Sequence, residues 1–321
     1  MLSRTVRGGK NLLQAAGPCV AYMGNNAAGH YVKMVHNGIE YAIMQMIGEI
    51  YDLLHRSGNY TNEELHAVFA NWNEGQLKSY LIEITAEIFK TKDTNSENFL
   101  VDEILDQAGS KGTGKWTSQE AMDLPVSIPT IDMAVAMRDL SVYKDQRVKA
   151  EQLYQPEIGT TEVTEEVLTD LENALAFSMV IAYAQGLSML AKASDEHKMD
   201  IPLPDVITVW KAGCIIRSTL LGNFTEAYKK DAKLVNLLLD KGIADLLKSR
   251  VKSIRNILGL ALKAGIPAMG LSSALGYYDA YLSGRLPTNL LQAQRDYFGA
   301  HTYQRLDKPG VFHTEWHTEN E

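Results

Sequence analysis

The sequence predicts one large all-α domain, built from two similar helical halves and followed by an extended C-terminal tail. Apolar residues recur at helical spacing over most of the chain, and the alternation typical of strands is nearly absent. No G-x-G-x-x-G motif follows a predicted strand, so no nicotinamide-binding fold is expected in this sequence. A weak repeat supports the two halves, because Trp72-Asn73-Glu74-Gly75 is echoed by Trp210-Lys211-Ala212-Gly213, each after an amphipathic helix.

Length, charge and cysteine content exclude several classes of protein. The 321 residues, 45% of them hydrophobic, suffice for a sizeable core, and the formal charge of −8 argues against general binding to nucleic acid or to an anionic membrane. Cys19 and Cys214 lie far apart, so we expect two reduced, buried thiols and neither a disulfide framework nor a metal site. No secretory signal and no window of about 18 uncharged apolar residues is seen, which favours a cytoplasmic location.

Three segments are predicted along the chain. Residues 1–28 have little pattern and are interpreted as a remnant linker or short strand. Residues 29–290 are expected to form the helical domain with its internal duplication. Residues 291–321 hold the end of the last helix and a tail with large aromatic residues, which need a covering surface on this domain or on a partner subunit.

The helices of the first half are predicted from apolar spacing and capping signals. A long helix runs from Gly29 to His55. Thr61, followed three residues later by Glu64, forms a capping box that opens the next helix, which closes near Gly75. Further helices are expected over residues 77–89, from about 98 to 108, and over 125–150.

The second half begins and ends with equally clear signals. Thr164, followed by two glutamates, is a suitable N-cap for a helix. A helix over residues 251–263 is stopped by Gly265 and Pro267. The last helix begins at Pro287 and leads into the tail.

Five polar side chains share one face of the first long helix. At about 100° per residue, Lys33, His36, Asn37, Glu40 and Tyr41 fall on the same side. A solvated face is the simplest interpretation, but the apolar patterning of this helix indicates that other helices enclose most of it. Polar groups on an enclosed helix need partners, and a ligand can be one. A lysine and a glutamate there provide a proton acceptor and a proton donor for acid–base catalysis.

A Gly-rich stretch and a lone arginine are the other candidates for ligand binding. Residues 109–115 satisfy G-x-x-x-x-G-K, yet Trp116 stands where a P-loop needs Ser or Thr, and the preceding segment is predicted to be helical. Phosphate binding through backbone amides and lysines fits better, and a flexible turn is the alternative. Arg138 lies on an apolar helix, where a structural ion pair is favoured over a ligand contact.

Three stretches, residues 33–41, 104–116 and 292–301, closely resemble 6-phosphogluconate dehydrogenase. The resemblance runs from about Gly24 to Trp316 and includes Trp210 and residues 213–218. The N-terminal Rossmann domain of the family has no counterpart here. The chain therefore resembles the C-terminal all-α domain alone.

The resemblance implies a reaction and a set of site residues. The family oxidises 6-phosphogluconate with NADP to a 3-keto acid, which loses carbon dioxide to give ribulose 5-phosphate without a metal. Lys33 would take the proton of the 3-hydroxyl, which requires a partly neutral amine, and Glu40 would protonate the enediol at C1. Substrate-binding roles are implied for His36, Asn37, Tyr41, Lys111, Thr113, Arg138, Arg295 and His301.

The same resemblance implies partners. His36 and Asn37 would hold hydroxyls and the carboxylate, and Tyr41, Lys111 and Arg138 would meet the phosphate. Residues matching Arg295 and His301 reach the neighbouring subunit's site in the family, which implies a homodimer with exchanged tails. The NADP site would lie mostly in the absent domain, so its residues are unknown here, and a separate Rossmann domain is a conceivable partner.

Two alternatives stay open from the sequence. A related β-hydroxyacid dehydrogenase would share the G-x-x-x-K-x-x-x-N pattern of Gly29, Lys33 and Asn37, but Lys111 and Arg295 speak against it. A non-catalytic oligomerisation scaffold would not need the acid–base pair that this chain keeps. Because the cofactor domain is missing, we expect the isolated chain to be inactive or nearly so, with residual affinity for the phosphorylated sugar acid.

Overall fold

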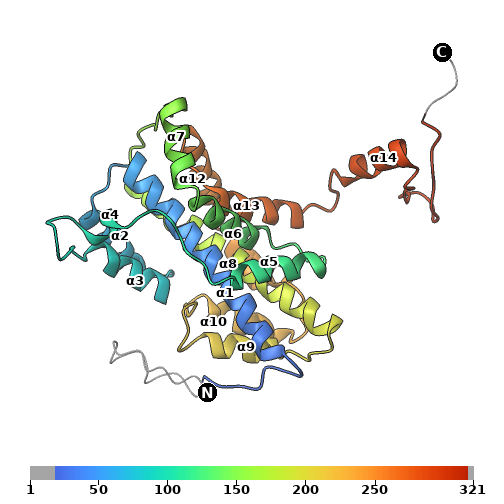
Figure 1. Ribbon diagram of the computed structural model, residues 1–321. Coiled ribbons are helices and arrows are strands. Elements are labelled where there is room, and N and C mark those ends of the chain that lie inside the picture. Colours follow the sequence, from blue (N-terminus) through green and yellow to red (C-terminus); the bar gives the residue numbers. More distant parts are fainter. Residues whose placement is uncertain (1–18, 317–321) are drawn as a thin grey trace, which may run out of the picture. The chain divides into compact units, whose positions relative to one another are not determined.

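The structure is a computed structural model that describes residues 19–316 (Figure 1). Within that range it has fourteen α-helices, two short helices of other types and no β-strand, which confirms the predicted all-α class. The chain divides into two compact units, one up to Tyr277 and one from Tyr278 onward. The elements are α1 Ala28–Asp52, η1 Leu53–Ser57, α2 Asn62–Trp72, α3 Tyr80–Phe89, α4 Leu100–Glu103, α5 Thr113–Asp123, α6 Pro129–Ser141, α7 Lys144–Tyr154, α8 Glu165–Glu196, α9 Leu203–Trp210, α10 Leu221–Lys230, η2 Leu237–Leu239, α11 Lys241–Lys248, α12 Val251–Ala264, α13 Met269–Tyr281 and α14 Thr288–Gly299.

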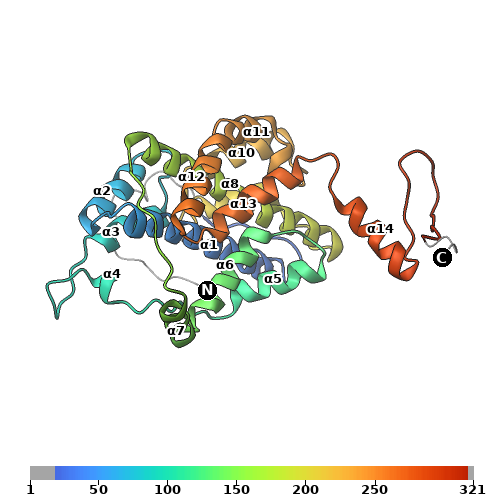
Figure 2. The ribbon, with the colours of Figure 1, turned by 90° about the horizontal axis from the view of Figure 1, so that it is seen from above.

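The first unit is organised around two long helices, α1 and α8, which pack against each other (Figures 1 and 2). A Cβ atom on Gly186 of α8 would lie 2.5 Å from Cδ1 of Ile39, so glycine allows the two helices to approach closely. Helices α5 and α6 pack on α1 as well. Ile39, Ile43 and Met46 are consequently buried, and each such side chain stabilises the fold by about 1.5–3 kcal/mol. The predicted enclosure of this helix is confirmed.

Helix α8 is long and apolar enough, by length and composition alone, to cross a membrane, so the expectation that the sequence has no such window was wrong. However, 89% of its most apolar 18-residue window is buried inside the protein. Its polar residue Gln185 is fully buried and forms two hydrogen bonds with Thr130 of α6. Gln185 Nε2 donates to the Thr130 hydroxyl at 2.9 Å, and Gln185 Oε1 accepts from the Thr130 backbone N–H at 3.0 Å. Helix α8 therefore serves as the core helix of this unit.

The capping signals lie where the sequence predicts helix ends. The backbone N–H of Glu64 donates to the Thr61 hydroxyl at 3.3 Å, and Glu64 accepts from the Thr61 N–H at 2.8 Å. Thr164 accepts from the N–H of Val167 at 3.3 Å and opens α8. Gly265, with φ of 72°, ends α12.

Two predicted helices differ from the structure. The helix expected from about 98 to 108 is reduced to the four residues of α4, because the backbone is extended at Ile104 and the chain then forms an exposed loop to Lys111. The helix expected over 125–150 is two helices, α6 and α7, with a break at Val142 and Tyr143. At the break, the Ser141 hydroxyl donates to the Arg138 carbonyl at 2.6 Å and satisfies one carbonyl of the last turn.

The structure describes only part of the predicted linker or short strand over residues 1–28. Residues 19–27 contain no strand and only a bend and a turn before α1, which fits the linker interpretation. Residues 1–18 lie outside the described residues, so the rest of the predicted linker or strand is not covered. The boundaries of the domain and its duplication stay predictions.

A buried carboxylate fastens the start of α13 to α1. Glu49 is 5% exposed, and its two oxygens accept from the N–H groups of Gly270 at 2.7 Å and Leu271 at 2.9 Å. Gln45 donates to the same carboxylate at 3.0 Å. Burial raises the pKa of Glu49, and these three hydrogen bonds oppose the rise. The unpaired amides of a helix N-terminus thus find an acceptor inside the core.

In the second unit, Asp296 of α14 holds the tail. Its Oδ1 lies 2.9 Å from both the Thr302 N–H and His313 Nδ1, and its Oδ2 accepts from the Thr314 N–H at 3.1 Å and from Trp316 Nε1 at 2.9 Å. Burial acts to raise the pKa of Asp296, but these hydrogen bonds outweigh it and lower the pKa to about 2. The tail is therefore folded against its own helix.

Asp296→Asn should loosen this tail, because an amide has one acceptor oxygen in place of two. We expect hydrogen exchange at the Thr302 and Thr314 amides to accelerate on the order of tenfold or more at pH 7, measured by mass spectrometry on the full chain. Since the folded pKa is depressed, the contribution of Asp296 is complete above about pH 4 and is lost as the pH falls through about 2.

Asp307→Asn is the matched control, because Asp307 lies in the same tail and its carboxylate accepts from Arg305, not from the amides that Asp296 holds. Equal exchange rates in the two variants would show that Asp296 does not hold the tail.

Candidate active site on the first long helix

Helix α1 brings four of the predicted side chains into one connected group. Lys33 Nζ lies 3.1 Å from His36 Nδ1, which is 3.2 Å from Asn37 Oδ1 and 3.9 Å from Glu40 Oε2. The helical spacing of these residues explains the arrangement, since positions three and four apart are neighbours on a helix. The polar face predicted from the sequence is therefore a contiguous array.

His36 occupies the centre of this array. It is 2% exposed, and its ring packs edge-on against Trp210 of α9 with centroids 5.9 Å apart. Burial first, and then the Lys33 charge, lowers the pKa of His36 to about 4, so the imidazole is neutral at pH 7. Its Nδ1 lies within hydrogen-bond distance of both Lys33 Nζ and Asn37 Oδ1, whereas its Nε2 is buried and has no hydrogen-bond partner among residues 19–316. This nitrogen can form a hydrogen bond with a ligand.

Lys33 and Glu40 are both shifted toward their neutral forms. Burial lowers the pKa of Lys33, although Glu40 and Cys214 oppose the shift. Burial raises the pKa of Glu40, although Lys33 and Arg138 oppose it. Lys33 keeps part of its side chain open to solvent, so a ligand can reach it. Acid–base chemistry needs a lowered lysine pKa and a raised carboxyl pKa, because the lysine must accept a proton and the carboxyl group must donate one.

Tyr41, Arg138 and the start of α5 form a second cluster beside the array. The Arg138 guanidinium lies 3.6 Å from the centroid of the Tyr41 ring. A Cβ atom on Gly114 would lie only 2.5 Å from Tyr41 Cδ2, so the first turn of α5 rests directly on this ring.

Lys111 and Thr113 lie in the segment that opens α5. Lys111 is exposed, Gly112 caps the helix with φ of 89°, and Thr113 is its first residue. Free amides at a helix N-terminus, together with a lysine and an arginine, make a suitable environment for an anion.

Arg295 and His301 belong to the second unit. Arg295 donates to Gln292 at 3.2 Å and is exposed. The His301 ring packs edge-on against Phe298 with centroids 5.8 Å apart. Their part in the site stays a prediction.

Trp210 and Cys214 adjoin the array on α1, at His36 and Lys33 respectively, and the sequence did not predict this contact. The Cys214 thiol donates to the Trp210 carbonyl at 3.1 Å. Burial raises the pKa of Cys214 to about 11, although the Lys33 and Arg217 charges oppose the rise. Cys19 and Cys214 form no disulfide with each other and are only partly buried, so the expectation of buried thiols was wrong. The repeat at Trp210 and the resemblance marked this segment, but neither placed it beside Lys33.

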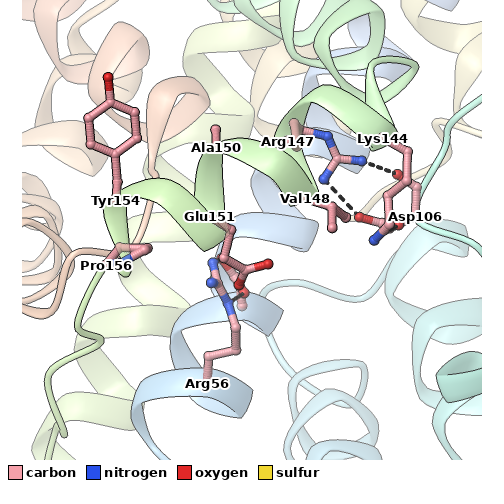
Figure 3. Close-up of a pocket in the computed structure, with 10 residues that line it drawn as sticks. Arg56, Asp106, Lys144, Arg147, Val148, Ala150, Glu151, Tyr154 and Pro156 are labelled. Atoms are coloured by element: carbon pink, nitrogen blue, oxygen red, sulfur yellow. Dashed lines mark hydrogen bonds and ion pairs between the residues drawn. The ribbon is translucent and has the colours of Figure 1, made fainter.

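A separate cavity of about 620 Å³ contains none of these residues. It is lined by the end of α1, by Asp106 and by one side of α7 (Figure 3). In the described part of the chain, no three or more His, Cys, Asp or Glu side chains gather as metal ligands would.

Comparisons with known proteins agree with this geometry. The family model for the 6-phosphogluconate dehydrogenase C-terminal domain matches residues 29–316. The decarboxylating 6-phosphogluconate dehydrogenase of Lactococcus lactis subsp. lactis is 53% identical over 304 residues, which cover 94% of this chain and 64% of that protein. The NADP(+)-dependent, decarboxylating enzyme of Bacillus subtilis is 50% identical over 301 residues, which cover 93% of this chain and 64% of that protein.

A solved structure gives the same result. Plasmodium falciparum 6-phosphogluconate dehydrogenase, described in its apo form and in complexes with NADP+ and with 6-phosphogluconate, has a TM-score of 0.90 at 45% identity. The match covers 93% of this chain and 65% of that one, so the chain spans somewhat less than two thirds of these relatives. This chain belongs to the 6-phosphogluconate dehydrogenase family, of which it carries the C-terminal domain.

Proposed function

We propose that this chain is the substrate-binding, catalytic and dimerisation domain for the oxidative decarboxylation of 6-phosphogluconate to ribulose 5-phosphate, a cytoplasmic step of the pentose phosphate pathway. The observation that carries the proposal is the Lys33, His36, Asn37 and Glu40 array on an enclosed helix. Relatives that are named for this reaction support it.

Lys33 and Glu40 divide the proton transfers between them. Neutral Lys33 accepts the proton of the 3-hydroxyl as the hydride at C3 leaves. The resulting ammonium returns a proton to the keto oxygen while the C1–C2 bond breaks and carbon dioxide departs. Glu40 then protonates the enediol at the carbon that lost carbon dioxide, while the Lys33 amine, neutral again, accepts the enol O–H proton and the ketone forms. The lowered pKa of Lys33 and the raised pKa of Glu40 favour these roles, and each transfer is typically worth about 10² to 10⁴ in rate.

The remaining residues orient the substrate. His36, through its unpartnered Nε2, and Asn37 hold hydroxyls and the carboxylate. Tyr41 and Arg138, with Lys111 and Thr113 at the start of α5, bind the phosphate. Arg295 and His301 act in the site of the partner subunit of a homodimer.

NADP supplies the hydride acceptor when it is bound. The described residues form no β-strand and hence no dinucleotide-binding sheet, so they do not make up the core of its site. A Rossmann domain, on the same polypeptide or separate, would hold the cofactor. NADP reduction by the purified 321-residue chain is therefore expected to be weak or absent.

Lys111→Ala tests the phosphate site. Calorimetric titration of the purified chain with 6-phosphogluconate should show binding, and the affinity of Lys111→Ala should fall about tenfold or more, because a charge-assisted contact to the phosphate is lost.

Lys115→Ala is the matched control for this titration, since Lys115 is an exposed lysine of the same segment without a proposed phosphate contact. If folded wild-type protein and both variants release no heat, the chain is a scaffold and not a substrate-binding domain.

Trace acetylation at varied pH tests the acid–base pair. Lys33 should reach half-maximal reactivity below the ordinary lysine pKa of 10.5, because burial lowers its pKa. Lys241 is the internal comparison, since its hydrogen bond to Asp245 raises its pKa. Glu40→Gln should lower the Lys33 pKa further, because the Glu40 charge stabilises the ammonium form. Mass spectrometry of the modified peptides reads both lysines, and Lys33 titrating together with Lys241 would refute the assignment.

A further inference from the structure

One wall of the cavity in Figure 3 is an ion-pair cluster that joins the loop before α5 to α7. Lys144 lies 2.7 Å from Asp106 Oδ1, and Arg147 donates to Asp106 Oδ2 at 2.9 Å. We call Asp106, Lys144 and Arg147 the loop clamp. It connects two segments that are 41 residues apart at Asp106 and Arg147.

Main-chain contacts extend the loop clamp along the loop. Arg147 also donates to the carbonyls of Asp106 at 3.2 Å and Ser141 at 3.0 Å. The Ser141 hydroxyl accepts from the Ala108 N–H at 2.9 Å. Longer contacts of 3.5 Å join Gln107 to the Val142 carbonyl and Arg138 to the Gly109 carbonyl. Every residue from 106 to 109 is thus tied to the junction of α6 and α7.

This segment leads directly into the candidate phosphate site. Lys111 follows Gly109 by two residues, and Thr113 opens α5. The loop is exposed and has no helix or strand of its own to order it, so without these contacts it would gain conformational freedom. We propose that Asp106 and Arg147 are positioning residues, which hold the loop so that Lys111 and Thr113 are ready for the substrate phosphate. The proposal rests on the proposed function.

The loop clamp is a network and not an isolated pair. Asp106 is 52% exposed and Arg147 33%, and a single exposed ion pair contributes little. Here one carboxylate binds two cations, and one guanidinium binds a carboxylate and two carbonyls, which favours a fixed geometry. Hydrogen bonds from Lys144 and Arg147 lower the pKa of Asp106 to about 2, so the network is intact at neutral pH.

The test compares Arg147→Met and Asp106→Asn with wild type in the full chain. If each variant leaves the loop correctly placed for a tenth to a third of the time, the affinity for 6-phosphogluconate falls about three- to tenfold. Hydrogen exchange of the amides from 107 to 112 should accelerate by a similar factor. Arg147→Lys should give an affinity and an exchange rate between those of wild type and Arg147→Met, because lysine keeps the charge but lacks the forked geometry.

Arg56→Met is the matched control. Arg56 lines the same cavity, but it pairs with Asp52 of its own helical segment and does not touch the loop. It should leave both the affinity and the exchange of residues 107–112 unchanged. Because the loop clamp acts through Lys111, Arg147→Met should cause little further loss in a Lys111→Ala background.

Unchanged exchange and affinity in both clamp variants would overturn the proposal, and so would a full additional loss in the Lys111→Ala background. A folded wild-type chain that does not bind 6-phosphogluconate contradicts the proposed function instead. The exchange data alone then decide whether the loop clamp orders the loop.

Discussion

The enclosure of α1 by α8, α5 and α6 is the constraint on which the candidate site depends. The packing that buries Val35, Ile39 and Ile43 also buries His36 and half-buries Asn37 and Glu40, while Lys33 keeps an exposed part. The same packing therefore stabilises the fold and shifts Lys33 and Glu40 toward neutrality. If α1 were exposed on both sides, its polar face would carry ordinary charges.

Charge and burial compete within the array. Lys33 and Glu40 each favour the charged form of the other, yet burial outweighs that attraction in both. His36 shares the environment and loses its charge altogether at pH 7. The pKa values of Lys33 and Glu40 are thus shifted in the directions that proton transfer requires.

Sequence reasoning succeeded where the determinants are local. Residues at a spacing of three and four must share a helix face. A capping box such as Thr61 with Glu64 marks a helix start through contacts between residues only three positions apart. Sequence reasoning failed where contacts between residues far apart in the sequence determine the structure. Asp106 bonds to Lys144 and Arg147 in place of continuing a helix, and Cys214 joins the site from another part of the chain. The roles of Arg295 and His301 rest on family resemblance, because no local pattern assigns them.

Glu49 shows how narrowly a buried acceptor limits sequence variation. Its two oxygens receive separate backbone N–H groups of α13, and glutamine would offer only one acceptor oxygen. Aspartate is shorter by a methylene, and an apolar residue would strand two buried donors at about 1–3 kcal/mol each. A change at position 49 therefore costs stability that a substitution in α13 cannot easily restore, because the stranded donors belong to the backbone. The identity of one side chain is thus fixed by the backbone of a helix 221 residues further along the chain.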